Sequence, residues 1–369
     1  MLTANCIWNS FQNSNKKHIV ITGTRGSGKT TLLSRLFPAS LPGITTWAEP
    51  GKAVYLKNNT TGQISQIGIY DSALDGFENK MSLIGDGFST LGIRTLKTAQ
   101  ESESKWISID EIGYLESTCN DYLETISYIM EKKHIVAIIR KQNLSHLKKL
   151  CGRDDVFLID LDNPLGNIGC VIMASGLGTR FGKNKLMTNF CGKPLISHIL
   201  DSTSGIFQKR IVVTRHKEVV DLCNQSDIDV IYHSLPNKNH TIRLGIESMT
   251  NMASCMFCTA DQPLLKKDTI TSLALLSINS SHKIIRPIYN KAPGSPVIFP
   301  QWTFKDLLHL PEGNSGSYII KQHPDTITYL PITNPYELED IDTPEDFIRL
   351  QKKACSFLIC TQNPGHIDL

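Results

Sequence analysis

The chain has little net charge and no long apolar run. Its 369 residues carry 38 Lys and Arg against 35 Asp and Glu, and the net charge of +3 is too small to favour a nucleic-acid or membrane-surface partner. No apolar stretch approaches the roughly 18 residues that span a bilayer. The polar start of the chain also lacks the apolar core of a secretory signal peptide. We therefore expect a cytoplasmic protein with no membrane and no nucleic-acid partner.

The chain also lacks a metal-binding cysteine pattern. Its ten cysteines are scattered, and Cys255 and Cys258 form a CxxC pair with no second pair or histidine at zinc-site spacing. Because strand side chains alternate between faces, these two thiols should point to opposite sides of a sheet. Reduced cysteine in an apolar run behaves as a small hydrophobe, so we expect structural cysteines rather than metal ligands.

Two series of apolar, strand-like runs divide the chain. In the first half such runs alternate with helical patterns, and a turn-rich stretch between residues 54–57 and 64–70 predicts a hairpin. Residues 162–167 break this series, and a second series begins at Cys170. Alternation of this kind is typical of mostly parallel sheets covered by helices. The sequence therefore predicts an α/β protein with domains at 1–165 and 166–355 and a tail at 356–369.

A phosphate-binding loop stands near the start of the first half. Residues 23–30, GTRGSGKT, satisfy the GxxxxGK[ST] pattern, with an apolar run before them and a helical pattern after them. Backbone N–H groups of this loop and the positive end of the following helix are expected to hold the phosphates of a nucleoside triphosphate. Lys29 would neutralise phosphate charge, and Thr30 would give a hydroxyl to Mg²⁺. The predicted nucleotide-binding residues are Gly23, Arg25, Gly26, Gly28, Lys29, Thr30 and Thr31.

An acidic pair ends a later strand. The run 106–109 is followed by Asp110 and Glu111, and an apolar strand ending in acid supplies the Mg²⁺ side of a P-loop site. Asp110 would hold the metal, while Glu111 would orient or deprotonate the attacking water. A second acid favours hydrolysis over transfer to an organic acceptor. The alternative interpretation is a strand followed by a solvated acidic turn.

Together these motifs resemble a small nucleoside-triphosphatase family whose Walker B segment reads Asp-Glu-Ile-Gly. The resemblance covers about residues 16–160 and is carried by the P-loop, the hairpin-like segment, Gly87-Phe88 and residues 109–113. It implies a P-loop domain that hydrolyses nucleoside triphosphates slowly and tolerates different bases, with ATP or GTP as substrate. Arg140, at a strand end, could contact the γ-phosphate or simply end a strand in solvent.

A second glycine-rich loop lies in the second half. Residues 174–182, ASGLGTRFG, follow an apolar run and lack the GK[ST] ending of a P-loop. They offer Arg180, with Lys185 five residues on, and these cations suit an α-phosphate under attack and a leaving pyrophosphate. The residues predicted to bind this nucleotide are Ala174, Ser175, Gly176, Gly178, Arg180, Lys185, Arg243 and Asp261.

The order of motifs from about Gly169 to Leu350 closely resembles the molybdenum cofactor nucleotidyltransferase family, and within it the cytidylyltransferase branch. The motifs that carry this resemblance are 174–182, 192–195, 241–245, 260–263, 294–297, 313–316 and 340–346. It implies a Rossmann-like α/β domain that uses Mg²⁺ and a nucleoside triphosphate. Asp261 is the implied Mg²⁺ ligand, with Asp342 or its neighbour Asp340 as the second. These last two carboxylates share one face of an extended segment, which suits a common metal ion.

The implied reaction needs no catalytic histidine. The terminal phosphate of molybdopterin is already an anion, and it would attack the α-phosphorus of CTP with Arg180, Lys185 and Mg²⁺ screening the charge. The histidines of this half are therefore expected on the surface or at helix ends: His198, His216, His233 and His240.

Three alternatives remain open at this point. Guanylyl transfer is less favoured, because that branch has two adjacent glycines where this chain has Ser175-Gly176. The loop would also suit a sugar-1-phosphate nucleotidyltransferase. Such enzymes carry a Pro-Lys pair after the loop, however, and this chain lacks it. A nucleotide-driven, non-catalytic assembly factor for a molybdenum enzyme would use the P-loop as a switch. We expect a bifunctional enzyme of molybdenum cofactor maturation that supplies the cofactor to a molybdenum hydroxylase.

Overall fold

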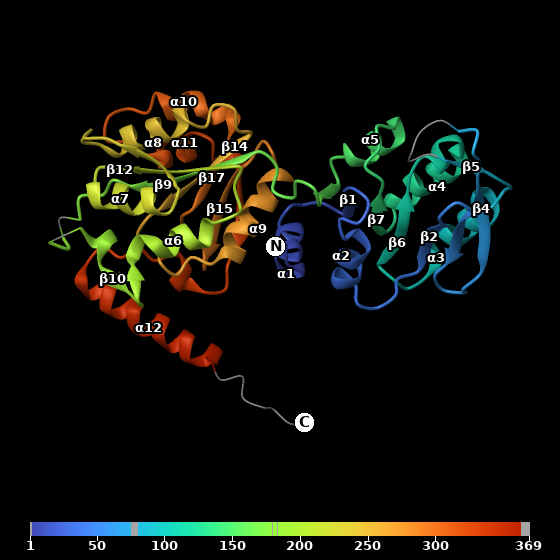
Figure 1. Ribbon diagram of the computed structural model, residues 1–369, viewed down its shortest axis with the longest axis horizontal. Helices are drawn as coiled ribbons and strands as arrows, with labels where there is room; N and C mark the ends of the chain where they lie inside the picture. The colour runs from blue at the N-terminus through green and yellow to red at the C-terminus, as the bar shows by residue number, and fades with distance from the viewer. Residues whose placement is uncertain (1, 75–79, 179, 183, 363–369) are drawn as a thin grey trace. The chain divides into compact units, whose positions relative to one another are not determined.

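The computed structural model describes residues 2–74, 80–178, 180–182 and 184–362, and from residue 355 on only the backbone (Figure 1). The chain forms two compact units, and the division falls between Pro164 and Leu165. One unit is Asn15–Pro164, and the other combines Leu165–Leu369 with Met1–Ser14. None of the helices in the described ranges has both the length and the apolar character needed to cross a membrane.

An eight-stranded sheet in the order β5-β4-β3-β2-β6-β7-β1-β8 forms the Asn15–Pro164 unit. Five strands that are neighbours in this order pair in parallel: β2 (Gly43–Glu49), β6 (Trp106–Ile112), β7 (His134–Ile139), β1 (His18–Thr22) and β8 (Val156–Asp160). An antiparallel meander extends the sheet: β3 (Ala53–Asn58), β4 (Ile64–Tyr70) and β5 (Met81–Leu83). The predicted hairpin is thus confirmed as β3–β4.

Helices cover both faces of this sheet. They are α2 (Lys29–Leu36), α3 (Ile93–Glu101), α4 (Asn120–Met130) and α5 (Ser145–Cys151), with a short π-helix at Phe88–Gly92 and a 3₁₀ helix at Leu115–Thr118. Val20 of β1 belongs to the same apolar cluster as Leu96 of α3 and Ile126 of α4. Its neighbours Ile19 and Ile21 point the other way and are fully buried. β1 is therefore an interior strand, between β7 and the edge strand β8, and its carboxyl end is where the P-loop begins.

The second unit has its own mixed sheet, in the order β13-β12-β9-β14-β17-β15-β16, with β18 paired to β15. β13 (Asp229–Tyr232), β12 (Lys209–Thr214), β9 (Ile168–Ala174) and β14 (Ser254–Thr259) are parallel. The remaining strands are β17 (Val297–Pro300), β15 (Ile284–Tyr289), β16 (Ala292–Pro293) and β18 (Ile327–Pro331). A separate small ladder joins β10 (Asn189–Phe190) to β11 (Lys193–Pro194).

Two apolar cores lie on the two faces of this second sheet. The core with Ile172 holds α6 (Leu195–Thr203), α7 (Lys217–Gln225), α9 (Lys267–Ile278) and α12 (Pro344–Gln362). The core with Val171 holds α8 (Lys238–Glu247), α10 (Phe304–Leu308) and α11 (Gly316–Gln322). Short 3₁₀ helices complete the unit at Lys185–Met187, Gln301–Thr303, Pro324–Thr326 and Pro335–Leu338. Cys258 belongs to the first core and Cys255 to the second, so the expected opposite orientation of the CxxC thiols is confirmed.

The start of the chain is a helix of the second unit, α1 (Ala4–Gln12), although the sequence analysis assigned it to the first domain. Ser10 Oγ donates a hydrogen bond to the Ser272 carbonyl of α9 at 2.8 Å. The buried residues of α1, which lie at helical spacing, are Cys6, Ile7, Ser10 and Phe11. This apolar stripe needs a partner, and α9 provides it. At the other end, α12 continues through residue 356, where the predicted tail begins, to Gln362.

Candidate active sites

The P-loop connects β1 to α2. Gly23, Gly26 and Gly28 have φ values of +149°, +80° and +94°, a region that residues with a Cβ rarely adopt. A Cβ on Gly23 would also lie 2.6 Å from Ser27 Oγ. Gly28 caps the N-terminus of α2. The glycine spacing of the motif therefore produces the turn that the sequence predicts.

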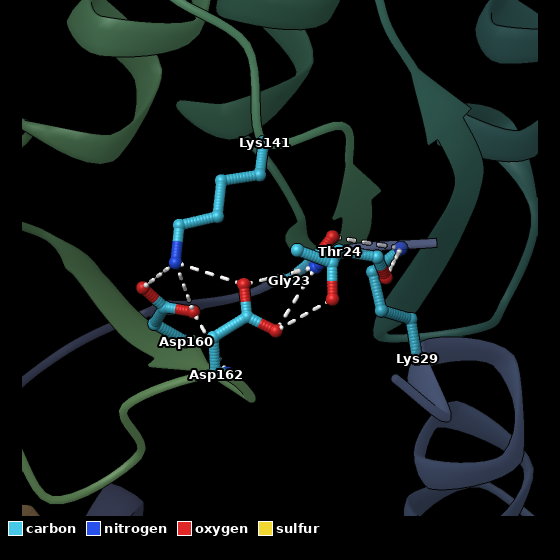
Figure 2. Close-up of polar contacts among 6 residues, drawn as sticks. All are labelled: Gly23, Thr24, Lys29, Lys141, Asp160 and Asp162. Carbon is cyan, nitrogen blue, oxygen red and sulfur yellow. Dashed lines mark hydrogen bonds and ion pairs between the residues drawn. The ribbon is translucent and has the colours of Figure 1, made fainter. Parts of the chain in front are cut away.

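Lys29 is folded over the first turn of this loop. Its Nζ donates to the carbonyl oxygens of Gly23 and Thr24, both at 2.9 Å (Figure 2). Arg25, Thr30 and Thr31 are exposed at the loop and at the start of α2. An ammonium group bound to neutral carbonyls keeps its full positive charge at the loop, where an anion would be attracted.

A second polar network supports the same loop (Figure 2). The Thr24 N–H lies 3.1 and 3.0 Å from the two carboxylate oxygens of Asp162, and Thr24 Oγ1 donates to Oδ1 at 2.9 Å. Lys141 Nζ bridges Asp160 at 2.8 Å and Asp162 at 2.9 Å. Hydrogen bonds from Lys141 and Thr24 lower the pKa of Asp162 to about 2. Asp162 is therefore ionised at neutral pH and holds the start of the P-loop.

Sequence reasoning missed this network. It treated residue 162 as part of a domain break and gave Lys141 no role. The usable signal was topological, because Lys141 follows β7 and Asp160 ends β8, and both strands flank β1. Side chains at the carboxyl ends of parallel neighbours meet at one edge of a sheet.

The acidic pair lies at the carboxyl end of β6. Burial, and then the neighbouring Glu111, raise the pKa of Asp110 to about 6, while the positive charge of Lys29 opposes this shift. Arg140 Nε lies 3.3 Å from the Glu111 carboxylate. Thr46 Oγ1 on β2 accepts from the Glu111 N–H at 2.9 Å and donates to the Glu111 carbonyl at 3.1 Å. The first site thus brings Lys29 and Asp110 into electrostatic contact and fixes the backbone of Glu111.

The second site converges on Lys185. Its Nζ lies 2.7 Å from Asp261 Oδ2 and 3.0 Å from Asp342 Oδ1, and it donates to the Ile341 carbonyl at 2.6 Å. Arg180 Nη1 lies 3.7 Å from Asp342 Oδ2. Burial alone would lower the pKa of Lys185, but attraction to the two carboxylates outweighs it and the pKa is raised. From the sequence we predict that Lys185 binds the triphosphate. In the structure its ammonium group lies between the two acids.

The second glycine-rich loop starts at the end of β9. Ser175 Oγ lies 2.8 Å from His233 Nε2, and His216 Nε2 lies 2.8 Å from the Gly176 carbonyl. Gly178 has a φ of +59°. His216 precedes α7 as its N-cap, which agrees with the expected helix-end position. The expectation is wrong for His233, which is 8% exposed and packs under the loop with Ser175 as its partner. Thr179 lies outside the described residues.

Arg243 pairs with a carboxylate of its own helix. It is on α8, with its Nε 3.7 Å from Glu247. Its role in nucleotide binding therefore remains a prediction.

Both sites offer oxygen ligands of the kind Mg²⁺ prefers. Over the described ranges, no three His, Cys, Asp or Glu side chains form a self-contained metal site. Mg²⁺ commonly binds through one or two carboxylates together with substrate phosphates and water. Asp110 with the Thr30 hydroxyl suits this pattern in the first unit. In the second unit, Asp261 and Asp342 both pair with the Lys185 ammonium group.

Comparisons with known proteins agree with this division. The NTPase family model matches residues 51–164, and the MobA-like NTP transferase domain matches residues 170–327. A nucleoside-triphosphatase THEP1 of a Thermotoga species is 30% identical over 155 residues, which are 40% of this chain and 88% of that protein. The molybdenum cofactor cytidylyltransferase of Escherichia coli is 23% identical over 194 residues, 50% of this chain and 96% of that enzyme.

A probable molybdenum cofactor guanylyltransferase of Natranaerobius thermophilus is 27% identical over 126 residues, which are 33% of this chain. The chain spans 60% of the length of that relative. The chain therefore belongs to the THEP1-type nucleoside-triphosphatase family in its first half and carries a MobA-like NTP transferase domain in its second.

Proposed function

We propose that the chain is a bifunctional enzyme. Its first unit hydrolyses nucleoside triphosphates, and its second transfers CMP from CTP to molybdopterin during maturation of the molybdenum cofactor. One observation carries this proposal: each unit has its own glycine-rich loop with its own lysine and carboxylates. A cytoplasmic location and a molybdenum hydroxylase as recipient of the product belong to the same proposal.

In the first site, the P-loop backbone and Lys29 bind the triphosphate, and Arg25 and Thr31 lie beside it. Asp110 and Thr30 would hold Mg²⁺, which supplies positive charge to the phosphates when bound. Glu111 orients the attacking water and accepts its proton, because it is the second acid of the pair. Its backbone is clamped by Thr46 and its carboxylate is paired with Arg140.

In the second site, an oxygen of the terminal phosphate of molybdopterin forms a bond to the α-phosphorus of CTP. The bond from that phosphorus to the bridging oxygen of the β-phosphate breaks, and pyrophosphate leaves. The loop at 174–182 and Arg180 bind the triphosphate. Asp261 and Asp342 would hold Mg²⁺, and Lys185 keeps these two carboxylates together. No proton needs to be removed from the attacking phosphate, so positioning supplies most of the catalysis.

The choice of CTP over GTP rests on two supporting observations. Ser175-Gly176 stands where the guanylyl branch carries two glycines. The matched segment also covers 96% of the cytidylyltransferase relative but only 60% of the guanylyltransferase relative. Guanylyl transfer is the second candidate, because a guanylyltransferase is among the relatives at similar identity.

The test is product release from the full chain with Mg²⁺, using CTP and GTP separately, with and without molybdopterin. The proposal expects pyrophosphate from CTP only when molybdopterin is present, and orthophosphate with or without it. If molybdopterin instead elicits pyrophosphate from GTP and not from CTP, the second unit is a guanylyltransferase and not a cytidylyltransferase. Orthophosphate alone, abolished by Lys29→Ala, would leave hydrolysis as the only activity and would favour a nucleotide-driven assembly factor.

A further inference from the structure

Three consecutive residues at the start of the nucleotidyltransferase loop are each held by a side chain from a neighbouring strand end. Thr214 Oγ1 donates to the Ala174 carbonyl at 2.9 Å. His233 Nε2 lies 2.8 Å from Ser175 Oγ, and His216 Nε2 lies 2.8 Å from the Gly176 carbonyl. Thr214 ends β12, His216 follows it, and His233 follows β13, so the anchors come from two adjacent parallel strands.

The hydrogen-bond partners assign the tautomer of His233. The Leu235 N–H donates to His233 Nδ1 at 3.2 Å, so this nitrogen is an acceptor. A neutral imidazole has one acceptor nitrogen and one N–H, so the proton is on Nε2. Burial lowers the pKa of His233, which keeps the ring neutral. His233 therefore donates to Ser175 Oγ, whose own hydroxyl proton goes to the Val213 carbonyl at 3.1 Å.

His216 must also be a donor at Nε2, because a carbonyl oxygen can only accept. The backbone N–H of His216 donates to Thr214 Oγ1 at 3.1 Å, so the two side chains that hold the loop from this strand end are linked. Thr241 Oγ1 of α8 lies 3.4 Å from His233 Nε2. The His233 ring thus joins the nucleotide loop to the helix that carries Arg243.

Among the described residues, packing does little to fix the loop at Gly176. Gly176 is exposed, and a Cβ placed on it would meet no atom within 4 Å. A loop that binds phosphate through backbone N–H groups must hold those groups in one orientation, since disorder would reduce affinity. The two imidazoles bind the carbonyl of Gly176 and the hydroxyl of Ser175, so they hold the loop without using its backbone N–H groups.

We propose that His216 and His233 are positioning residues that pre-form the nucleotide-binding loop of the transferase unit. They do not touch the reacting atoms; they act through Gly176 and Ser175. This inference rests on the proposed nucleotidyl transfer. It assigns a function to two histidines that the transfer chemistry itself does not require.

The experiment measures binding of Mg²⁺-CTP and Mg²⁺-GTP by calorimetry in the full chain, in a Lys29→Ala background that removes P-loop binding. His216→Ala and His233→Ala should each raise the Kd about tenfold, the effect of losing one well-placed hydrogen bond. His216→Gln and His233→Gln should stay within about threefold of the background, because the glutamine Nε2 can donate in place of the ring. In the transfer reaction the alanine variants should raise KM for the nucleotide more than they lower kcat.

His198→Ala is the matched control. His198 also directs Nε2 to a backbone carbonyl, that of Phe190 at 2.8 Å, but it lies on α6 rather than at the loop. Ser175→Ala provides a second route if His233→Ala fails to fold. It should weaken binding as much as loss of His233, and adding His233→Gln should weaken it no further.

The outcomes separate the two claims. If the Lys29→Ala background binds neither nucleotide, the proposed transfer function fails and this inference fails with it. If the background binds CTP or GTP but the folded alanine variants bind equally well, only the inference is overturned. Equal weakening by His198→Ala would also overturn it, because the effect would then not depend on the loop.

Discussion

Each unit of the molecule places a lysine beside a glycine-rich loop, but the two ammonium groups have different partners. Lys29 binds two neutral carbonyls of its own loop at 2.9 Å. Lys185 binds two carboxylates that are distant in the sequence, one in the turn after β14 and one in the loop before α12, and the three side chains together carry one negative charge. The same residue type therefore does two jobs. Lys29 presents charge to an anion, whereas Lys185 organises the acids that face a cation.

The strongest way to break this comparison is to remove each lysine in turn. Lys29→Ala should lower hydrolysis by about 100-fold or more and leave nucleotidyl transfer unchanged, because charge stabilisation at a phosphate is worth this much. Lys185→Ala should do the reverse. Orthophosphate and pyrophosphate release from the same preparations would measure both effects. Loss of both activities in either single variant would contradict the division into two independent sites.

Acid should destabilise the first unit through its buried histidine. His18 is fully buried, accepts from the Ile135 N–H, and has a pKa lowered to about 4 by burial despite the nearby Asp155. Between about pH 6.5 and 4 the unfolded chain binds a proton that the folded one does not, so stability falls as pH falls, by about 3 kcal/mol in total.

Denaturant unfolding of the full chain between pH 7 and pH 4 would measure this loss. In His18→Asn, the amide oxygen can still accept from Ile135, and the pH dependence of the first transition should flatten. An unchanged slope would show that other groups cause the acid sensitivity.

Lys185 should also stabilise the fold. Lys185→Met keeps the apolar stem but leaves Asp261 and Asp342 facing each other, and we expect a loss of about 1–2 kcal/mol, reduced from the value of a fully buried pair because Asp342 is exposed. Mg²⁺ should raise the melting temperature of this variant more than that of the parent, since the acids regain a cation. Thermal denaturation with and without Mg²⁺ would measure this, and an equal response would argue against a cation site between the acids.

The smallest expected effect concerns the backbone of Glu111. Thr46→Val removes the hydroxyl that bonds both its N–H and its carbonyl. We expect kcat for hydrolysis to fall about 5- to 10-fold, which corresponds to about one hydrogen bond. Thr46→Ser retains the hydroxyl and should stay close to the parent. A loss in Thr46→Ser equal to that in Thr46→Val would assign the effect to packing of the methyl group.

Local patterns allowed much of the fold to be predicted. The runs at 18–22, 64–70 and 170–173 are strands, and the GxxxxGK[ST] spacing marks a real strand–loop–helix turn. β2 was missed because Gly43–Glu49 shows no alternation of apolar and polar residues. Its first two residues are buried, and its last three are exposed. α1 was missed because its apolar stripe has meaning only when α9 covers it.

The sites were predictable to different depths for a physical reason. Residues of the P-loop contact each other across fewer than seven positions, so their pattern is local. Lys185 and Asp342 are 157 residues apart, and only the order of motifs indicated that they would meet. His233 and Ser175 are 58 residues apart in no recognisable motif. Their contact depends on the order β13-β12-β9 in the sheet, which no local pattern in the sequence reveals.

The position of α1 has a practical consequence for cutting the chain. Because α1 belongs to the second unit, the first unit is an insertion with both of its ends joined to that partner. A protease cut near residue 164 should leave two fragments that purify together, held by the α1–α9 contact. A fragment that starts at residue 165 would expose the face of α9 that α1 covers and should be prone to aggregate. Separate expression of the transferase unit therefore calls for residues 2–14 to be fused back through a short linker.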